Sequence, residues 1–219
     1  MPDTKMRVEV TDGVAVSALR SAARGVASGT WTFVYAPGAG ANIDDPFGRC
    51  LADVLPARGV SVVRFQFPYM EAHRRSPDRT SLLEATWRAV IDAVRTPGEK
   101  LCVGGRSMGG RIASQVVAGR VPVDALALFA YPLHPPGLPE RSRDAHLASV
   151  RVRTLFCSGT RDAFASPDEL RAVAARMRRA KVHLLETADH GFTPARASGR
   201  TRDHVFAEAA AALARWLRV

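Results

Sequence analysis

The sequence predicts an α/β fold with a mostly parallel sheet and helices on both faces. Short apolar, β-branched runs alternate with helix-length amphipathic segments from about residue 30 onward, which is typical of repeated β–α units. The length of 219 residues suits one α/β domain over residues 1–219. A hydrophobic fraction of 47% and a charged fraction of 24% are ordinary for a globular protein and argue against disorder, collagen and coiled coil.

The chain begins with an expected hairpin. Residues 6–10 and 14–19 are strand-like and flank Thr11-Asp12-Gly13, a turn sequence. Residues 30–36 are a β-rich run and form the next expected strand.

A helix is expected to follow this third strand and to run to about residue 57. Asp44 or Asp45 can cap it, Pro46 suits its first turn and Gly59 ends it. A buried strand is expected over residues 60–67, which are largely apolar.

The middle of the chain continues the alternation. Residues 81–95 predict a helix, because apolar side chains recur at helical spacing, and Thr96-Pro97-Gly98 ends it. Residues 101–104 are a short apolar strand, residues 108–118 the next helix and residues 125–130 the next strand. The helical apolar positions of the first of these helices are Leu83, Trp87, Val90, Ile91 and Val94.

The last third adds two strands and two helices. Residues 131–148 are rich in Pro, Arg and His and are interpreted mostly as a loop. A strand at 153–158, a helix at 167–178 capped by Ser166, and a strand at 181–186 follow. An amphipathic helix over 203–217 closes the chain, with apolar positions Val205, Phe206, Ala209, Leu213, Trp216 and Leu217.

Charge and cysteine content narrow the class of protein. The net charge is +10, but the 31 basic residues include only three lysines and are scattered. We interpret this as a coding bias toward arginine, and no nucleic-acid partner is expected. Cys50, Cys102 and Cys157 are widely spaced and odd in number, which predicts buried free thiols in a reducing, cytoplasmic location.

Two kinds of segment are absent from the sequence. No apolar stretch reaches 18 residues, so no membrane partner is expected. No apolar run follows the charged start at residues 1–7, so no signal peptide is expected.

The central chemical signal is Gly105-Arg106-Ser107-Met108-Gly109, a G-x-S-x-G nucleophile elbow. It follows an apolar strand and precedes a helix, which is the context that the motif requires. Glycines on both sides of Ser107 allow the neighbouring backbone to pass close to a sharp turn. The N–H groups at the start of the helix can support a developing anion.

A serine nucleophile needs a base and an acid that orients the base. The expected chain order is Ser, then Asp or Glu, then His. Asp162 follows the strand at 153–158, and His190 follows the strand at 181–186. Asp168 suits a helix start and Asp189 adjoins His190, so both are weaker candidates for the acid. The other histidines considered lie inside a strand or lack a strand-end context: His183, His73, His146 and His204.

The oxyanion hole needs two backbone donors. One is expected to be the N–H of Met108, the residue after the nucleophile. The other should come from the small-residue loop after the strand at 30–36, with Ala39 as the main candidate and Gly40 as the alternative. A simple turn into a helix is the competing interpretation of this loop.

Several motifs together resemble the small α/β-hydrolases related to dienelactone hydrolase, from about residue 30 to the end. The resemblance implies an α/β-hydrolase fold with a minimal lid or none, and a triad of Ser107, Asp162 and His190. Ser107 replaces the cysteine of dienelactone hydrolase, so that enzyme's lactone substrate is not implied, and Pro37 stands where many relatives have histidine. The motifs are Pro37-Gly38-Ala39-Gly40, Arg64-Phe65-Gln66-Phe67-Pro68-Tyr69-Met70-Glu71, Gly105-Arg106-Ser107-Met108-Gly109-Gly110-Arg111, Tyr131-Pro132-Leu133-His134-Pro135-Pro136-Gly137 and Gly159-Thr160-Arg161-Asp162.

Four residues are candidates for substrate contact: Gly40, Tyr69, Tyr131 and His134. Tyr131 and His134 follow a strand and could overhang the site, or belong to a connection stiffened by proline. Tyr69 could line the pocket or pack in the core.

The sequence therefore predicts a serine hydrolase acting on a small ester, thioester or lactone acyl substrate. Neither a metal nor an organic cofactor is implied. The alternative hypothesis is a hydrolase-fold protein that serves as a non-catalytic binding or interaction module. Nothing in the sequence indicates an oligomeric state.

Overall fold

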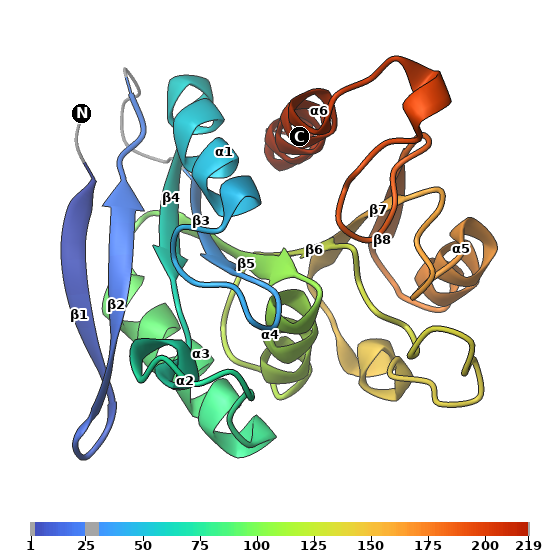
Figure 1. The fold of residues 1–219 in the computed structure, drawn as a ribbon. Helices are drawn as coiled ribbons and strands as arrows, with labels where there is room; N and C mark the ends of the chain where they lie inside the picture. The colour runs from blue at the N-terminus through green and yellow to red at the C-terminus, as the bar shows by residue number, and fades with distance from the viewer. Residues whose placement is uncertain (1–2, 25–30, 219) are drawn as a thin grey trace.

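The computed structural model describes residues 3–24 and 31–218. An eight-stranded sheet of order β1-β2-β4-β3-β5-β6-β7-β8 crosses the molecule (Figure 1). The pairs β1–β2 and β2–β4 are antiparallel, and all other neighbours are parallel. The predicted mostly parallel sheet is thus confirmed. The strands are β1 (Thr4–Thr11), β2 (Val14–Ser21), β3 (Trp31–Ala36), β4 (Val60–Phe65), β5 (Lys100–Arg106), β6 (Ala125–Phe129), β7 (Arg153–Gly159) and β8 (Ala180–Leu185).

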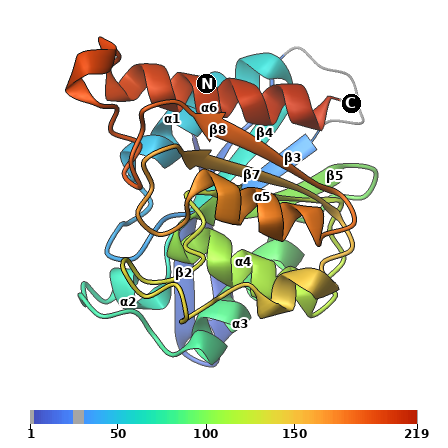
Figure 2. The ribbon, with the colours of Figure 1, turned by 90° about the vertical axis from the view of Figure 1, so that its right-hand side faces the viewer.

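Helices cover both faces of the sheet. The helices α1 and α6 pack on one face, and α3, α4 and α5 pack on the other (Figures 1 and 2). Side chains of β3 alternate between the two cores, as a strand buried on both faces requires: Phe33 and Tyr35 face one, Val34 and Ala36 the other. The helices are α1 (Pro46–Val54), α2 (Pro68–Glu71), α3 (Thr80–Val94), α4 (Met108–Ala118), α5 (Pro167–Ala175) and α6 (Arg202–Leu217), with short 3₁₀ turns at Pro56–Arg58, Ala145–Ser149 and Arg196–Ser198.

Two predicted helix starts have the expected caps. Asp45, rather than Asp44, caps α1, and its carboxylate accepts the N–H of Gly48. Ser166 caps α5 in a reciprocal capping box with Glu169. Both caps satisfy helix N–H groups that have no intrahelical partner.

Several element bounds differ from the predictions. The first helix ends at Val54, and Pro56 starts a separate 3₁₀ turn, because proline lacks the N–H that would continue the helix. The strand predicted over 60–67 ends at Phe65, and the short helix α2 then begins at Pro68. Thr30, predicted to begin the third strand, lies outside the described residues.

The strand β5 is longer than predicted. It extends through Gly104 and Gly105 to Arg106, where it pairs with β6. The predicted strand ends at Gly104, and the low strand propensity of glycine conceals its continuation through Gly105. The extension carries the strand directly to Ser107.

The connection between β6 and β7 adds no separate layer over the sheet. Within residues 131–152 the structure has one short 3₁₀ turn, Ala145–Ser149. This confirms a fold with a minimal lid or none. Among the described helices, none combines the length and apolarity needed to cross a lipid bilayer.

The three cysteines are free thiols. Cys102 and Cys157 are buried in the core on the α1 and α6 side of the sheet. Cys50 is half-buried, and burial raises the pKa of its thiol to about 11. Because the thiolate is the reactive form, these cysteines are poor nucleophiles near neutral pH.

The close packing of β5 against β6 yields a stability prediction. A Cβ added at Gly104 would lie 1.8 Å from the carbonyl oxygen of Ala127, which is backbone and cannot move aside. We expect Gly104→Ala to reduce the free energy of unfolding by about 3 kcal/mol or more, measured by urea denaturation.

Gly119→Ala is the matched control, because the new methyl would approach its nearest neighbour, the carbonyl oxygen of Val116, at 3.3 Å. We expect the control to change stability by about 1 kcal/mol or less. Equal stability of the two variants would contradict the steric argument.

Candidate active site

Ser107 lies at a sharp turn between β5 and α4. Its φ of 50° and ψ of −117° are unusual for a residue with a side chain. Its N–H donates to the carbonyl of Phe129 at 2.8 Å. This strained turn presents the hydroxyl at the carboxyl end of the sheet, as a nucleophile elbow does.

The carbonyl oxygen of Ala36 leaves no room for a side chain at Gly105 or Gly109 of the motif. A Cβ on Gly105 would lie 2.2 Å from the carbonyl oxygen of Ala36, and one on Gly109 would lie 2.3 Å from the same atom. Trp87 adds a hydrogen bond from its indole Nε1 to the carbonyl of Gly109 at 3.2 Å. The start of α4 is therefore held against the end of β3.

The structure brings Ser107, His190 and Asp162 together. The Nε2 atom of His190 lies 3.0 Å from the Oγ of Ser107. Its Nδ1 lies 2.9 Å from Oδ1 and 3.0 Å from Oδ2 of Asp162. Asp162 follows β7 and His190 follows β8, so parallel strands deliver both residues to the same end of the sheet.

The Asp162 carboxylate is fully buried, whereas a quarter of the His190 side chain is exposed. Burying a carboxylate requires hydrogen-bond donors around it. Ser158 donates its hydroxyl to Oδ2 at 3.0 Å, and Phe164 donates its N–H to Oδ1 at 2.9 Å. These contacts fix the carboxylate so that it orients the Nδ1 side of the imidazole.

The other two candidate acids, Asp189 and Asp168, make different contacts in the structure. Asp189 shapes the turn that carries His190, because its Oδ1 accepts the N–H groups of Gly191 and Thr193, each at 2.8 Å. Asp168 is exposed and pairs with Arg171 on the surface of α5. The geometry thus favours Asp162 as the partner of His190.

Three of the other histidines have partners elsewhere. His183 lies 3.1 Å from Glu208, His146 lies 2.7 Å from Ser114, and the Nδ1 of His204 accepts the N–H of Thr201 at the start of α6. In the described residues, no group of three or more His, Cys, Asp or Glu side chains is arranged to hold a metal ion.

Two backbone N–H groups near Ser107 are available for an oxyanion. Across the described chain, no hydrogen bond uses the N–H of Met108 or of Ala39. The N–H of Gly40 instead donates to the hydroxyl of Tyr69 at 3.0 Å. This favours Ala39 over Gly40 as the second donor. A Cβ on Gly38 would lie 3.6 Å from the Cβ of Ser107, so this loop reaches the nucleophile.

Tyr69 anchors the loop that carries Ala39 and Gly40. Its side chain is fully buried, so it belongs to the core and offers no surface to a substrate. Burial raises the pKa of its hydroxyl, which therefore stays protonated near neutral pH. The expected substrate contact is corrected to a hydrogen bond that positions Gly40.

Tyr131 and His134 also differ from their expected roles. Tyr131 is buried and donates its hydroxyl to the carbonyl of Arg143 at 3.0 Å, and burial raises its pKa to about 12. The buried ring of His134 contacts the carbonyl of Pro135 through Nδ1 at 2.8 Å, and its Nε2 lies 3.1 Å from Oε1 of Glu169 without hydrogen-bond geometry. The structure corrects both expectations, because these side chains anchor the connection between β6 and β7.

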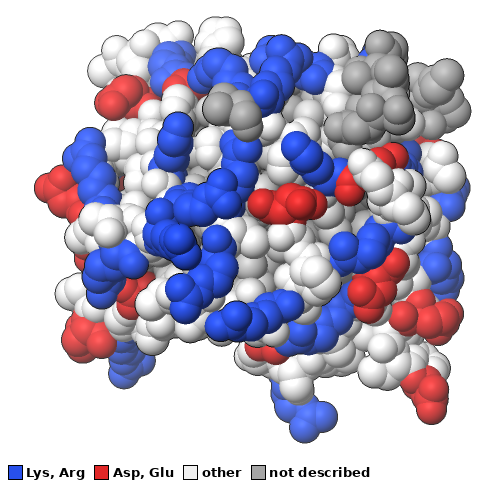
Figure 3. Space-filling view, turned by 180° about the vertical axis from the view of Figure 1, so that it is seen from behind, with Lys and Arg blue, Asp and Glu red and all other residues white. Residues whose placement is uncertain are grey.

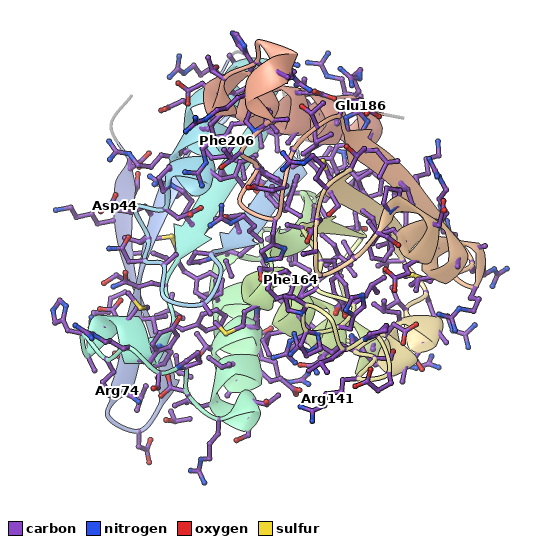
Figure 4. The ribbon with its side chains drawn as sticks, turned by 45° about the vertical axis from the view of Figure 1, so that its right-hand side comes forward. Asp44, Arg74, Arg141, Phe164, Glu186 and Phe206 are labelled. Atoms are coloured by element: carbon purple, nitrogen blue, oxygen red, sulfur yellow. The ribbon has the colours of Figure 1, made fainter. Side chains whose placement is uncertain are left out.

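Phe164 was not identified from the sequence. Its ring centroid lies 4.0 Å from that of His190, with 31° between the ring planes, and it sits near the centre of the view in Figure 4. It shields one face of the imidazole from water. Its position two residues after Asp162 was the only signal available, and no sequence pattern marks it.

A second unpredicted feature supports the elbow from the other face of the sheet. Asp45 accepts the Tyr35 hydroxyl at 2.6 Å and pairs with Arg106 at 3.4 Å. Burial, together with the Asp45 charge, raises the pKa of Tyr35. The residue before Ser107 is thus linked to the start of α1.

The fold is that of an α/β hydrolase. Residues 29–218 match the family described as "Alpha/beta hydrolase domain", and the chain belongs to this family.

Solved structures share the fold over nearly the whole chain. A serine hydrolase without lid, XC6422 from Xanthomonas campestris, has a TM-score of 0.75 at 18% identity, covering 99% of this chain and 95% of its own. An esterase domain from Rhodothermus marinus has a TM-score of 0.73 at 17% identity, covering 100% and 98%. Dienelactone hydrolase from Anabaena variabilis has a TM-score of 0.73 at 20% identity, covering 100% and 98%.

The Tyr69–Gly40 hydrogen bond yields a kinetic prediction. Tyr69→Phe keeps the buried ring but removes the acceptor of the Gly40 N–H, which loosens the loop carrying Ala39. We expect kcat on an activated ester to fall about tenfold with little change in KM, because the oxyanion forms only during reaction.

Tyr131→Phe is the control, since it also removes one buried hydroxyl but leaves the loop after β3 untouched. Both variants should have the thermal unfolding temperature measured alongside kcat and KM. An equal loss of kcat in the two variants would refute the positioning role of Tyr69.

Proposed function

We propose that this protein is a serine hydrolase that cleaves a small ester, thioester or lactone through an acyl-enzyme. The observation that carries the proposal is the continuous hydrogen-bond chain from Asp162 through His190 to Ser107, with contacts of 2.9 to 3.0 Å. Such a chain activates a hydroxyl that is otherwise a weak nucleophile.

The first half-reaction follows from this geometry. With Asp162 ionised, the proton of His190 resides on Nδ1, and the free Nε2 lone pair faces the Ser107 hydroxyl. Ser107 Oγ attacks the acyl carbon while His190 takes its proton. The N–H groups of Met108 and Ala39 bind the oxygen that becomes negative, and His190 then protonates the leaving group.

The second half-reaction repeats the same steps with water. His190 removes a proton from water, which attacks the acyl carbon, and Ser107 leaves with the proton returned by His190. Asp162 stabilises the imidazolium in both halves. Phe164, stacked on the ring, covers one face of this cation and contributes a favourable aromatic contact.

The substrate is proposed to be small because little of the chain can cover the site. The connection between β6 and β7 is tied down through Tyr131 and His134 and forms no cap. The fold shared with an esterase domain and a dienelactone hydrolase supports ester or lactone chemistry. The free cysteines support a cytoplasmic location.

Covalent labelling tests the nucleophile. A fluorophosphonate should react once per chain, at Ser107, because this is the serine whose hydroxyl contacts His190 Nε2. Peptide mass mapping locates the adduct, and Ser107→Ala should abolish it. An adduct on a different serine would overturn the assignment of Ser107 as nucleophile, and an unchanged ester turnover in Ser107→Ala would favour the non-catalytic alternative.

Substitution of the acid tests the triad. Asp162→Asn should keep the fold but lower kcat/KM by about 10⁴, the loss seen for the equivalent change in a Ser-His-Asp protease, because the amide no longer holds the proton on Nδ1. Asp168→Asn is the control, since Asp168 is exposed and pairs with Arg171 on the surface of α5, and it should lower kcat/KM less than about threefold. Near-normal activity of Asp162→Asn with inactive Ser107→Ala would indicate a Ser-His dyad.

A further inference from the structure

A basic groove lies at the end of the sheet where β7 and β8 begin. It has a volume of about 620 Å³ and runs between these strands and the last turns of α6. Its floor is apolar, with Leu155, Ala212 and Trp216, and its cations are Arg153, Arg179, Lys181 and Arg215. Figure 2 shows β7 and β8 side on, and Figure 3 shows Lys and Arg gathered left of centre on the face from which these strands start.

The groove is separate from the catalytic site. Arg153 begins β7, whereas Asp162 follows its end, and β7 is seven residues long. At about 3.3 Å per residue the two ends of this strand are roughly 20 Å apart. A ligand in the groove therefore does not compete with an ester at Ser107.

Three of the groove's cations, Arg179, Lys181 and Arg215, are exposed. In the part of the chain that the structure describes, no carboxylate pairs with Arg179, Lys181 or Arg215. The neighbouring carboxylate of Glu208 already contacts His183 and Arg200. Unneutralised like charges in a concave surface repel one another and raise the local concentration of anions.

One further cation is held rigidly at the floor. The guanidinium of Arg153 lies 4.2 Å from the ring centroid of Trp216 and 5.9 Å from that of Trp31, and it donates to the carbonyl of Trp216. Burial lowers the pKa of its guanidinium. The aromatic contacts fix its direction before any ligand arrives.

We propose that this groove binds a small organic phosphate. Guanidinium and ammonium groups converge on a volume within the range of ligand pockets, about 300–1,000 Å³, and arginine forks match phosphate oxygens. The apolar floor suits the organic part of such a molecule.

Titration calorimetry at physiological salt tests the proposal, with ATP, phenyl phosphate, tripolyphosphate and a 20-nucleotide single strand as probes. We expect ATP to bind more tightly than tripolyphosphate, because only ATP covers the apolar floor. Tight binding of ATP but not phenyl phosphate assigns the site to nucleotides, and binding of both assigns it to phosphate esters generally. Ser107→Ala should bind like wild type, which separates this site from the proposed hydrolysis.

The variant Arg179→Ala/Lys181→Ala/Arg215→Ala should weaken ATP binding by roughly 30-fold or more, because it removes three charge-assisted contacts. The control Lys5→Ala/Arg7→Ala/Arg75→Ala removes the same charge from exposed positions, two of them on β1 at the opposite edge of the sheet, and should change binding less than about twofold. Lys181→Ala alone, expected to weaken binding about fivefold, serves if the triple variant does not fold.

Four outcomes would overturn the proposal. These are no ATP binding, equal weakening in both triple variants, equal affinity for tripolyphosphate and ATP, and far tighter binding of the oligonucleotide than of ATP. The first three reduce the groove to a general surface charge, and the last assigns it to a nucleic-acid strand.

Discussion

The site depends on how closely three backbones meet beside Ser107. The carbonyl oxygen of Ala36 occupies the space that a Cβ on Gly105 or on Gly109 would need. This contact joins the end of β3, the end of β5 and the start of α4 at one point. It also determines where the chain goes after Ala36, so the loop carrying Ala39 and the elbow carrying Ser107 are positioned by the same constraint.

The remaining catalytic groups follow from parallel topology and from local hydrogen bonds. Parallel neighbours end at the same edge of a sheet, so β7 and β8 bring Asp162 and His190 to the edge where β5 delivers Ser107. Strand topology alone does not determine the conformation of the loops that follow β7 and β8. Ser158 and the Phe164 N–H fix the carboxylate, and Asp189 fixes the turn that carries His190.

Much of the architecture was readable in the sequence because its signals are local. Helical spacing, proline and glycine at element ends, and capping residues are all short-range patterns. The elbow motif and the strand-end positions of Asp162 and His190 identified the three residues that the structure brings together. The roles of Tyr69, Tyr131, His134 and Phe164 were not readable, because each rests on a partner distant in the chain or on a ring contact that leaves no pattern.

The distribution of charge is a further feature that the sequence alone did not predict, because it depends on which residues the fold brings together. Along the chain the arginines look scattered, and scattered cations are a usual product of composition. The fold nevertheless collects Arg153, the pair Arg179 and Lys181, and Arg215 around one groove, because β7, β8 and α6 are neighbours in space. Tertiary structure therefore converts an ordinary composition into a local electrostatic field. Whether that field has a ligand depends on which of these cations are neutralised by carboxylates and on the shape of the apolar floor between them. Net charge carries neither kind of information, so a basic sequence becomes an argument about binding only once its cations have been placed in three dimensions.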